Sequence, residues 1–360
     1  MQKSYANFKD PFGLLKRMLL SGDRAARSAL YRAATMKFVG PLDLMLEKSE
    51  RRLLQEENRI SNLPIIFVVG APRSGTTLLH QTLARYLPVT YFTNLSALFP
   101  RAPLTASLKF ARFLKAKRFD DRSFYGNVAG WAAPNDGFHV WNRWLGTDRY
   151  RAPQQISASA AREMRTFFNA WLAAFEQPFI NKNNRNTDCV ALLASIFDHA
   201  CFIEVRRHPV YVAQSLLQAR QQIQGSAEIG WGLHSADSSS GKGHIDEICE
   251  QVFSIEKKLR TDKQRVAPGR YIEVSYERFC QLPREHVQKI TRTFLQQELD
   301  ESALRQNLQP FRVTNEIRIG RMEFDQIQKR IEALYGASAL SKFEDYPLTH
   351  CEALPAAPQL

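Results

Sequence analysis

The residues best suited to chemistry form a short loop, Gly70-Ala71-Pro72-Arg73-Ser74-Gly75-Thr76-Thr77, after a run of β-branched and aromatic residues at 65–69. Leucines at helical spacing follow the loop, so the segment predicts a buried strand, a glycine turn and a helix. Backbone N–H groups at the start of such a helix have no partner within it, and the helix dipole adds positive potential there. The loop therefore predicts a binding site for phosphate or a similar oxyanion.

One position separates this loop from the phosphate loop of nucleotide triphosphatases. Gly70 and Gly75 have the required spacing, but Thr76 occupies the position where those enzymes keep a lysine. The positive charge lies at Arg73 instead, where a guanidinium stays charged at any pH and can bind an oxyanion through two N–H groups. An ordinary strand-to-helix turn with a surface arginine is the alternative interpretation. The residues that we expect to bind the anion are Pro72, Arg73, Ser74, Gly75, Thr76 and Thr77.

A second stretch repeats this arrangement. Residues 200–205 predict a buried strand that ends in Arg206 and Arg207, and a helix beginning at Pro209 carries Ser215 in its second turn. A triphosphatase more often places an acidic residue on such a strand to hold Mg²⁺, whereas two arginines favour direct contact with another anion. The competing interpretation is that both arginines pair with acidic residues of the fold.

Three more polar residues are candidates for the same site. Lys182 ends a short strand predicted at 178–182, and strand ends of open α/β sheets face the ligand crevice. Asp136 and His139 fall on one face of a helix that Asn135 would cap, where a carboxylate beside an imidazole is a candidate general base pair. The alternatives are a solvated surface lysine, a helix-capping aspartate and a half-buried histidine.

The composition is that of a large globular protein. A chain of 360 residues that is 44% hydrophobic predicts one large α/β domain with helical additions. Its five dispersed cysteines, without a CxxC pair, predict reduced thiols and no zinc site. With no run of eighteen apolar residues and no apolar leader, we expect no membrane span, no secretory signal and a cytoplasmic location. The net charge of +13 predicts an anionic partner without identifying it.

The chain is expected to divide unevenly. Residues 1–62 predict a basic helical extension that packs on the core or lies on an anionic membrane surface. Residues 63–350 then form the main domain, with a helical insertion at about 89–177 shaping the substrate cleft. The Gly- and Ser-rich stretch 223–244 predicts a mobile loop, and 351–360 a disordered tail.

With both anion stretches in view, the sequence resembles the sulfotransferases that use 3'-phosphoadenosine 5'-phosphosulfate (PAPS). The family's 5'-phosphosulfate loop is similar to residues 71–77, and its 3'-phosphate motif resembles Arg207 with Ser215 eight positions later. The resemblance covers residues 64–280 and implies a P-loop-like three-layer α/β sandwich with a central parallel sheet and helical insertions.

The resemblance reaches Lys182 and also Tyr276, at the end of a strand predicted at 271–276, where the family places an adenine-side tyrosine. It implies in-line attack of an acceptor hydroxyl or amine on the sulfur of PAPS, with Arg73 and Lys182 stabilising the transferring group and leaving phosphate. The acceptor would be a carbohydrate, a lipid or a small molecule. No metal and no nucleic acid are expected.

The sequence departs from familiar members at the general base. Where some carry a glutamate soon after the loop helix, this chain has Thr93 and Asn94, and where others carry a histidine two residues beyond the strand-end lysine, it has Asn184. Our hypothesis is that Asp136, with His139, activates the acceptor.

Two rival functions remain at this stage. One is a nucleotide-dependent kinase, which the threonine at the lysine position disfavours. The other is a basic membrane- or nucleic-acid-associated protein that uses a degenerate nucleotide fold only to bind.

Overall fold

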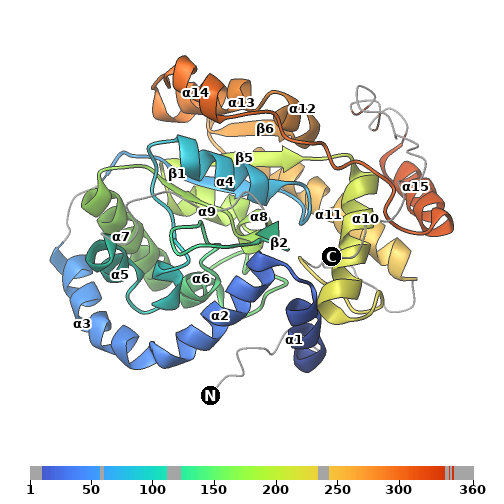
Figure 1. The fold of residues 1–360 in the computed structure, drawn as a ribbon. Coiled ribbons are helices and arrows are strands. Elements are labelled where there is room, and N and C mark those ends of the chain that lie inside the picture. The colour runs from blue at the N-terminus through green and yellow to red at the C-terminus, as the bar shows by residue number, and fades with distance from the viewer. Residues whose placement is uncertain are drawn as a thin grey trace.

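The protein is built around a sheet of four parallel strands. The computed structural model describes residues 10–56, 61–111, 123–233, 243–336, 340 and 343. Within them the sheet has the order β4-β1-β5-β6 (Figure 1), so β1 pairs with β4 on one side and with β5 on the other. The strands predicted from the sequence are confirmed as β1 Ile65–Val69, β4 Phe179–Asn181, β5 Ala200–Arg206 and β6 Tyr271–Ser275.

Helices cover both faces of this sheet. Along β1, Phe67 and Val69 point into one core and Ile66 and Val68 into the other, which explains why the strand is apolar at every position. The first core is closed by α6 (Phe138–Leu145), α7 (Ala158–Phe175), α9 (Val190–Ile196), α10 (Pro209–Ala219), α11 (His244–Lys263) and α15 (Arg321–Tyr335). The second is closed by α4 (Thr76–Tyr86), α12 (Tyr276–Gln281), α13 (Pro283–Ile290) and α14 (Glu301–Asn307). The three-layer α/β fold is therefore confirmed.

The stretch between α4 and β4 holds short helices and a small hairpin. Its elements are η1 (Ser96–Leu98), α5 (Pro103–Lys109), the strands β2 (Ser123–Phe124) and β3 (Asn127–Val128), and the helices α6 and α7. Aromatic side chains of α7 pack into the core: Phe168 lies against Trp141 of α6 at a ring separation of 5.4 Å, and Trp171 against Phe92 at 5.1 Å. These contacts fix the insertion to the sheet edge at β4.

Three helices precede the sheet: α1 (Pro11–Leu20), α2 (Arg24–Phe38) and α3 (Gly40–Glu56). Met18 of α1 and Ala26 of α2 share an apolar cluster with Phe124 of the hairpin and with Ile223 of η3 (Arg220–Gln224). Arg32 of α2 donates a hydrogen bond to the Val128 carbonyl at 3.1 Å. The first helices thus rest on the β2–β3 hairpin.

Two expectations fall partly or wholly outside the described residues. Residues 234–242 of the Gly- and Ser-rich stretch and the whole of the predicted tail at 351–360 belong to the part that the structure does not describe. Among the described helices, none combines the length and apolarity that a bilayer crossing needs.

Candidate active site at the carboxyl ends of the strands

A predicted site residue follows each of the four strands, so these residues lie together at the carboxyl end of the sheet. The anion loop follows β1, Lys182 follows β4, Arg207 follows β5 and Tyr276 follows β6. In the strand order β4-β1-β5-β6 the chain runs from β1 to β4 on one side and from β5 to β6 on the other, so a crevice opens at the carboxyl ends of β1 and β5. A cavity of 150 Å³ lies there, and its wall contains the predicted residues Pro72, Arg73, Gly75, Thr76, Thr77, Lys182, Arg207 and Tyr276.

The loop between β1 and α4 is shaped for an anion. Gly70, Arg73 and Gly75 all have positive φ angles, of 147°, 76° and 103°. Gly75 is the N-cap of α4 and has no side chain to cap it, so the N–H groups of the first helical turn are left for a ligand. Ser74 is buried, and within the described residues its hydroxyl has no hydrogen-bond partner.

Arg73 joins the two anion motifs. Its Nε donates a hydrogen bond to the Ser215 hydroxyl of α10 at 2.9 Å, and its carbonyl accepts one from Nη1 of Arg207 at 3.2 Å. The guanidinium also lies 4.8 Å from the centre of the Tyr125 ring. Burial lowers the pKa of Arg73. The two motifs therefore lie on one side of the molecule, although Ser215 is not among the residues that line the cavity.

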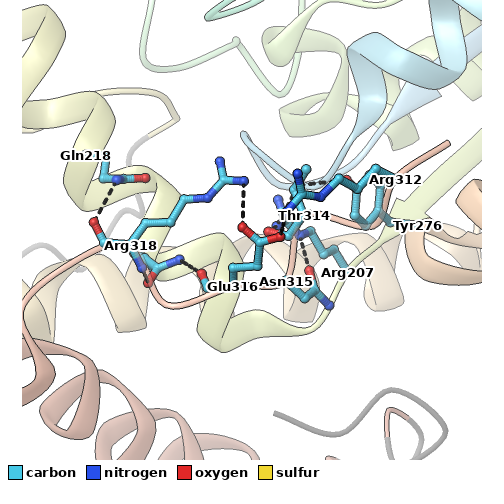
Figure 2. A network of polar contacts seen from close by, with 9 residues as sticks. Arg207, Gln218, Tyr276, Arg312, Thr314, Asn315, Glu316 and Arg318 are labelled. Carbon is cyan, nitrogen blue, oxygen red and sulfur yellow. Dashed lines mark hydrogen bonds and ion pairs between the residues drawn. The ribbon is translucent and has the colours of Figure 1, made fainter. Parts of the chain in front are cut away.

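Arg207 is held rigidly in the wall. Its Nε donates to Oδ1 of Asn315 at 3.0 Å, its Nη2 donates to the Thr314 carbonyl at 2.8 Å, and its guanidinium stacks 4.7 Å from the Tyr276 ring (Figure 2). Among the described residues no carboxylate forms an ion pair with Arg207. Burial lowers its pKa, whereas the charge of Glu277, which accepts a hydrogen bond from Asn315, raises it. A buried cation without a carboxylate in direct contact favours an anionic ligand.

Arg206 has a different role, and its expected contact with an anion is wrong. Its guanidinium lies 3.5 Å from Glu273 and 3.9 Å from both Glu204 and Glu256, on the side of the sheet away from the cavity. Successive residues of a strand point to opposite faces, so only one of the two arginines can face the ligand. The alternative of pairing within the fold holds for Arg206 and not for Arg207.

Lys182 is buried in the cavity wall, so the alternative of a solvated lysine is wrong. Its side chain is 9% exposed, and a Cβ at Gly126 would lie 3.4 Å from Nζ, which places the ammonium beneath the hairpin tip. Within the described residues it has no hydrogen bond or ion pair. Burial lowers the pKa of Lys182, whereas the charge of Asp136 raises it. An unpaired ammonium here suits a negatively charged group beside the loop.

Asp136 and His139 do not share a helical face, so that expectation is wrong. Helix α6 begins only at Phe138, with Gly137 as its N-cap in the left-handed region at φ 65°. A Cβ on Gly137 would lie 2.4 Å from the Phe92 ring, so packing against the core decides where the helix starts. The Asp136 carboxylate is exposed and accepts a hydrogen bond from the Phe138 N–H at 3.3 Å, while His139 is half-buried and its pKa is lowered by burial.

The wall also contains seven residues that the sequence analysis did not assign to the site: Leu78, Ser123, Tyr125, Gly126, Asn184, Trp231 and Thr314. Tyr125 and Gly126 form the hairpin tip with positive φ angles, and a glycine between two short apolar stretches was the available signal. Thr314 bonds the Tyr276 hydroxyl at 2.8 Å but lies 38 positions away, and no local pattern marks it.

Comparison with known proteins agrees with this geometry. Residues 64–301 match the family model described as the Sulfotransferase family. The chain belongs to the sulfotransferase family. A curated relative, the omega-hydroxy-beta-dihydromenaquinone-9 sulfotransferase Stf3 of Mycobacterium bovis, is 24% identical over 238 positions. That alignment covers 59% of this chain and 58% of the relative, and Stf3 of Mycobacterium tuberculosis matches equally.

Two solved structures share the fold. Sulfotransferase STF1 from Mycobacterium tuberculosis H37Rv superposes with a TM-score of 0.53 at 14% identity, covering 91% of this chain and 92% of that chain. Sulfotransferase STF9 from Mycobacterium avium has the same TM-score and identity, with coverage of 94% and 87%. The family implies a sulfonate donor as co-substrate. Among the described residues, no group of three or more histidine, cysteine, aspartate or glutamate side chains could hold a metal ion.

Proposed function

We propose that this sulfotransferase uses PAPS as its donor and transfers the sulfuryl group to a hydroxyl or amine of its acceptor. The observation that carries this proposal is the shared cavity of the two anion motifs, in which the Arg73 carbonyl lies 3.2 Å from Nη1 of Arg207. PAPS has a phosphosulfate at one end and a phosphate at the other, so it requires two neighbouring anion sites on one side of the protein.

In the proposed complex, the uncapped N–H groups of α4, the loop hydroxyls and Arg73 hold the phosphosulfate. Arg207 and Ser215 take the 3'-phosphate, and for this the Ser215 hydroxyl exchanges its bond with Arg73 for one with the ligand. Tyr276 lies between the two anion sites, with its ring against Gly75, and is proposed to face the adenine.

The transfer step follows from the charges around the loop. The acceptor oxygen or nitrogen bonds to sulfur while the bond from sulfur to the 5'-phosphate oxygen breaks, leaving adenosine 3',5'-bisphosphate. Lys182 and Arg73 stabilise the negative charge that grows on the leaving phosphate. The acceptor proton passes to Asp136, whose exposed carboxylate is close enough to Lys182 to raise the pKa of that ammonium. His139 has no hydrogen bond to Asp136, so we assign the proton transfer to Asp136 alone.

We further propose that the acceptor is a lipid or another amphiphilic alcohol. The matched relative is named for sulfation of a hydroxylated menaquinone, and the cavity wall here includes the aromatic rings of Tyr125 and Trp231. Aromatic rings suit an apolar acceptor chain whose polar end must reach the sulfur.

The donor is tested by calorimetric titration with adenosine 3',5'-bisphosphate, followed by a transfer assay with labelled PAPS in the presence of a metal chelator. Arg207→Ala should weaken bisphosphate binding at least tenfold, because a charge-assisted contact is lost. Arg292→Ala is the matched control, since that arginine pairs with Glu298 on the surface and does not line the cavity. Phosphate transfer from ATP with Mg²⁺, without turnover of PAPS, would instead support the kinase.

A further inference from the structure

Helix α1 has apolar side chains on both of its sides. Leu14 and Met18 face inward and join the cluster against the hairpin. On the outer side, Phe12, Leu19 and Leu20 are 85%, 56% and 75% exposed. The outer side of a surface helix is ordinarily polar, so this helix has an apolar surface without a partner in the described structure.

A second apolar surface lies where α2 meets α3. Phe38 is 84% exposed, Leu44 58% and Met45 74%. Nine of the thirteen large apolar side chains that are exposed in the described residues lie between residues 12 and 45, so they are clustered rather than scattered. Figure 1 shows α1, α2 and α3 along one edge of the molecule. We call this surface the N-terminal edge, defined by Phe12, Leu15, Leu19, Leu20, Phe38, Leu42, Leu44 and Met45.

The charge of these helices indicates what the N-terminal edge contacts. Helices α1 and α2 contain six basic residues and no acidic residue, whereas α3 contains three basic and four acidic residues, so the three helices together have a net charge of +5. Lys16, Arg24, Arg27 and Lys37 have no ion pair within the described residues. Arg24 and Arg27 share one stripe of α2 with Tyr31 and Phe38, at spacings of three, seven and fourteen. Apolar side chains flanked by free cations complement an anionic lipid surface, whereas a second copy of the same edge would bring like charges together.

The N-terminal edge is connected to the active site. Helices α1 and α2 pack on the hairpin whose tip residue, Tyr125, lines the cavity, and Phe124 belongs to the same apolar cluster as Met18. A surface bound by these helices would therefore lie next to the hairpin that covers the cavity.

We propose that the N-terminal edge docks this sulfotransferase on an anionic lipid bilayer, with the apolar side chains of α1 and of the α2–α3 corner entering the headgroup region. Arg24, Arg27 and the neighbouring lysines then contact lipid phosphates. The inference goes beyond the proposed donor chemistry and does not depend on PAPS being the donor.

The experiment measures co-flotation of the full chain with phosphatidylcholine vesicles, with and without phosphatidylglycerol. The wild type should bind the anionic vesicles, more weakly at high salt, and should bind neutral vesicles less. The double variant Phe12→Ser, Leu20→Ser should lose about tenfold or more in partitioning, and so should Phe38→Ser, Met45→Ser, because each removes apolar area that enters the lipid.

The matched control is Met322→Ser on α15, since Met322 is 74% exposed, as Met45 is, but lies far along the chain from the N-terminal edge. It should bind vesicles like the wild type. All variants should keep the wild-type affinity for adenosine 3',5'-bisphosphate, which separates loss of docking from loss of the fold or of the donor site. Equal vesicle binding by all variants, or no binding by the wild type, would overturn the proposal. A dimer that dissociates in the serine variants would also overturn it and would assign the N-terminal edge to a second copy of the chain.

Discussion

Gly75 provides the sharpest test of how the cavity wall is built. It has φ +103°, and a Cβ added there would lie 2.4 Å from Cδ2 and 3.0 Å from Cε2 of Tyr276. Two costs should therefore add in Gly75→Ala. A side chain in the left-handed region costs about 1–2 kcal/mol, and overpacking against the ring costs about 1–3 kcal/mol. The free energy of unfolding should fall by about 2–5 kcal/mol in total.

The two costs can be separated by repeating the substitution in a Tyr276→Ala background. Without the ring only the backbone cost remains, so Gly75→Ala should there cost about 1–2 kcal/mol. Urea unfolding of the four proteins in this cycle measures both values. Gly269→Ala is the matched control, because Gly269 has φ +79° and nothing within 4 Å of its added Cβ, and its cost should be the same in both backgrounds.

An equal loss in the free energy of unfolding from Gly75→Ala with and without the tyrosine ring would contradict this prediction. That result would mean that the ring does not press against the loop, and the wall between the two anion sites would have to be arranged differently. If the reasoning holds, Gly75→Ala should also weaken binding of adenosine 3',5'-bisphosphate, since a displaced ring no longer stacks beneath Arg207.

Three further predictions concern single ionisable groups. Because burial lowers the pKa of Lys182, the rate of sulfuryl transfer should decline with rising pH at a lower pH than the pKa of an ordinary lysine would give. Lys182→Arg should move that decline to higher pH. An unchanged pH profile in this variant would exclude a role of the Lys182 charge in transfer. Burial raises the pKa of Glu256 to about 7, above its ordinary 4.5. The folded state then keeps a proton that the unfolded chain releases, so stability should fall by roughly 3 kcal/mol as pH rises from about 4.5 to 7, and Glu256→Gln should flatten this dependence in denaturant unfolding. Asp136→Asn should slow sulfuryl transfer about a hundredfold or more at unchanged affinity for adenosine 3',5'-bisphosphate. Asp148→Asn is the control and should leave the rate unchanged, because it removes a similar carboxylate that accepts a hydrogen bond from the N–H two residues later. Equal rates for both variants would remove Asp136 from catalysis.

Much of the sheet and of the anion loop could be predicted because their signals are local. Parallel strands covered on both faces are apolar throughout, so β1 and β5 are visible as short apolar runs bounded by glycine or charge. The loop at 70–77 requires glycines at fixed spacing because its backbone adopts positive φ angles. The order of these elements also placed Lys182 and Arg207 at strand ends.

Local signals failed where packing between distant segments decides the structure. The sequence predicts a helix capped by Asn135, but the helix begins only at Phe138, because Gly137 packs against the Phe92 ring with a positive φ angle. Nothing in the pair Arg206 and Arg207 distinguishes the arginine that pairs with glutamates from the one in the cavity wall, since this depends on the direction in which each side chain points where β5 ends at Arg206.

The sequence alone was enough to predict the kind of ligand, an oxyanion that we propose is bound by the glycine loop and arginines, because residue types and short spacings carry that chemistry. Only the tertiary structure decided which groups share one cavity. Asn315 and Thr314, more than a hundred positions from Arg207, fix the guanidinium, and the β2–β3 hairpin covers Lys182. Such contacts form only when distant segments of the chain pack against one another, so no short stretch of sequence predicts them.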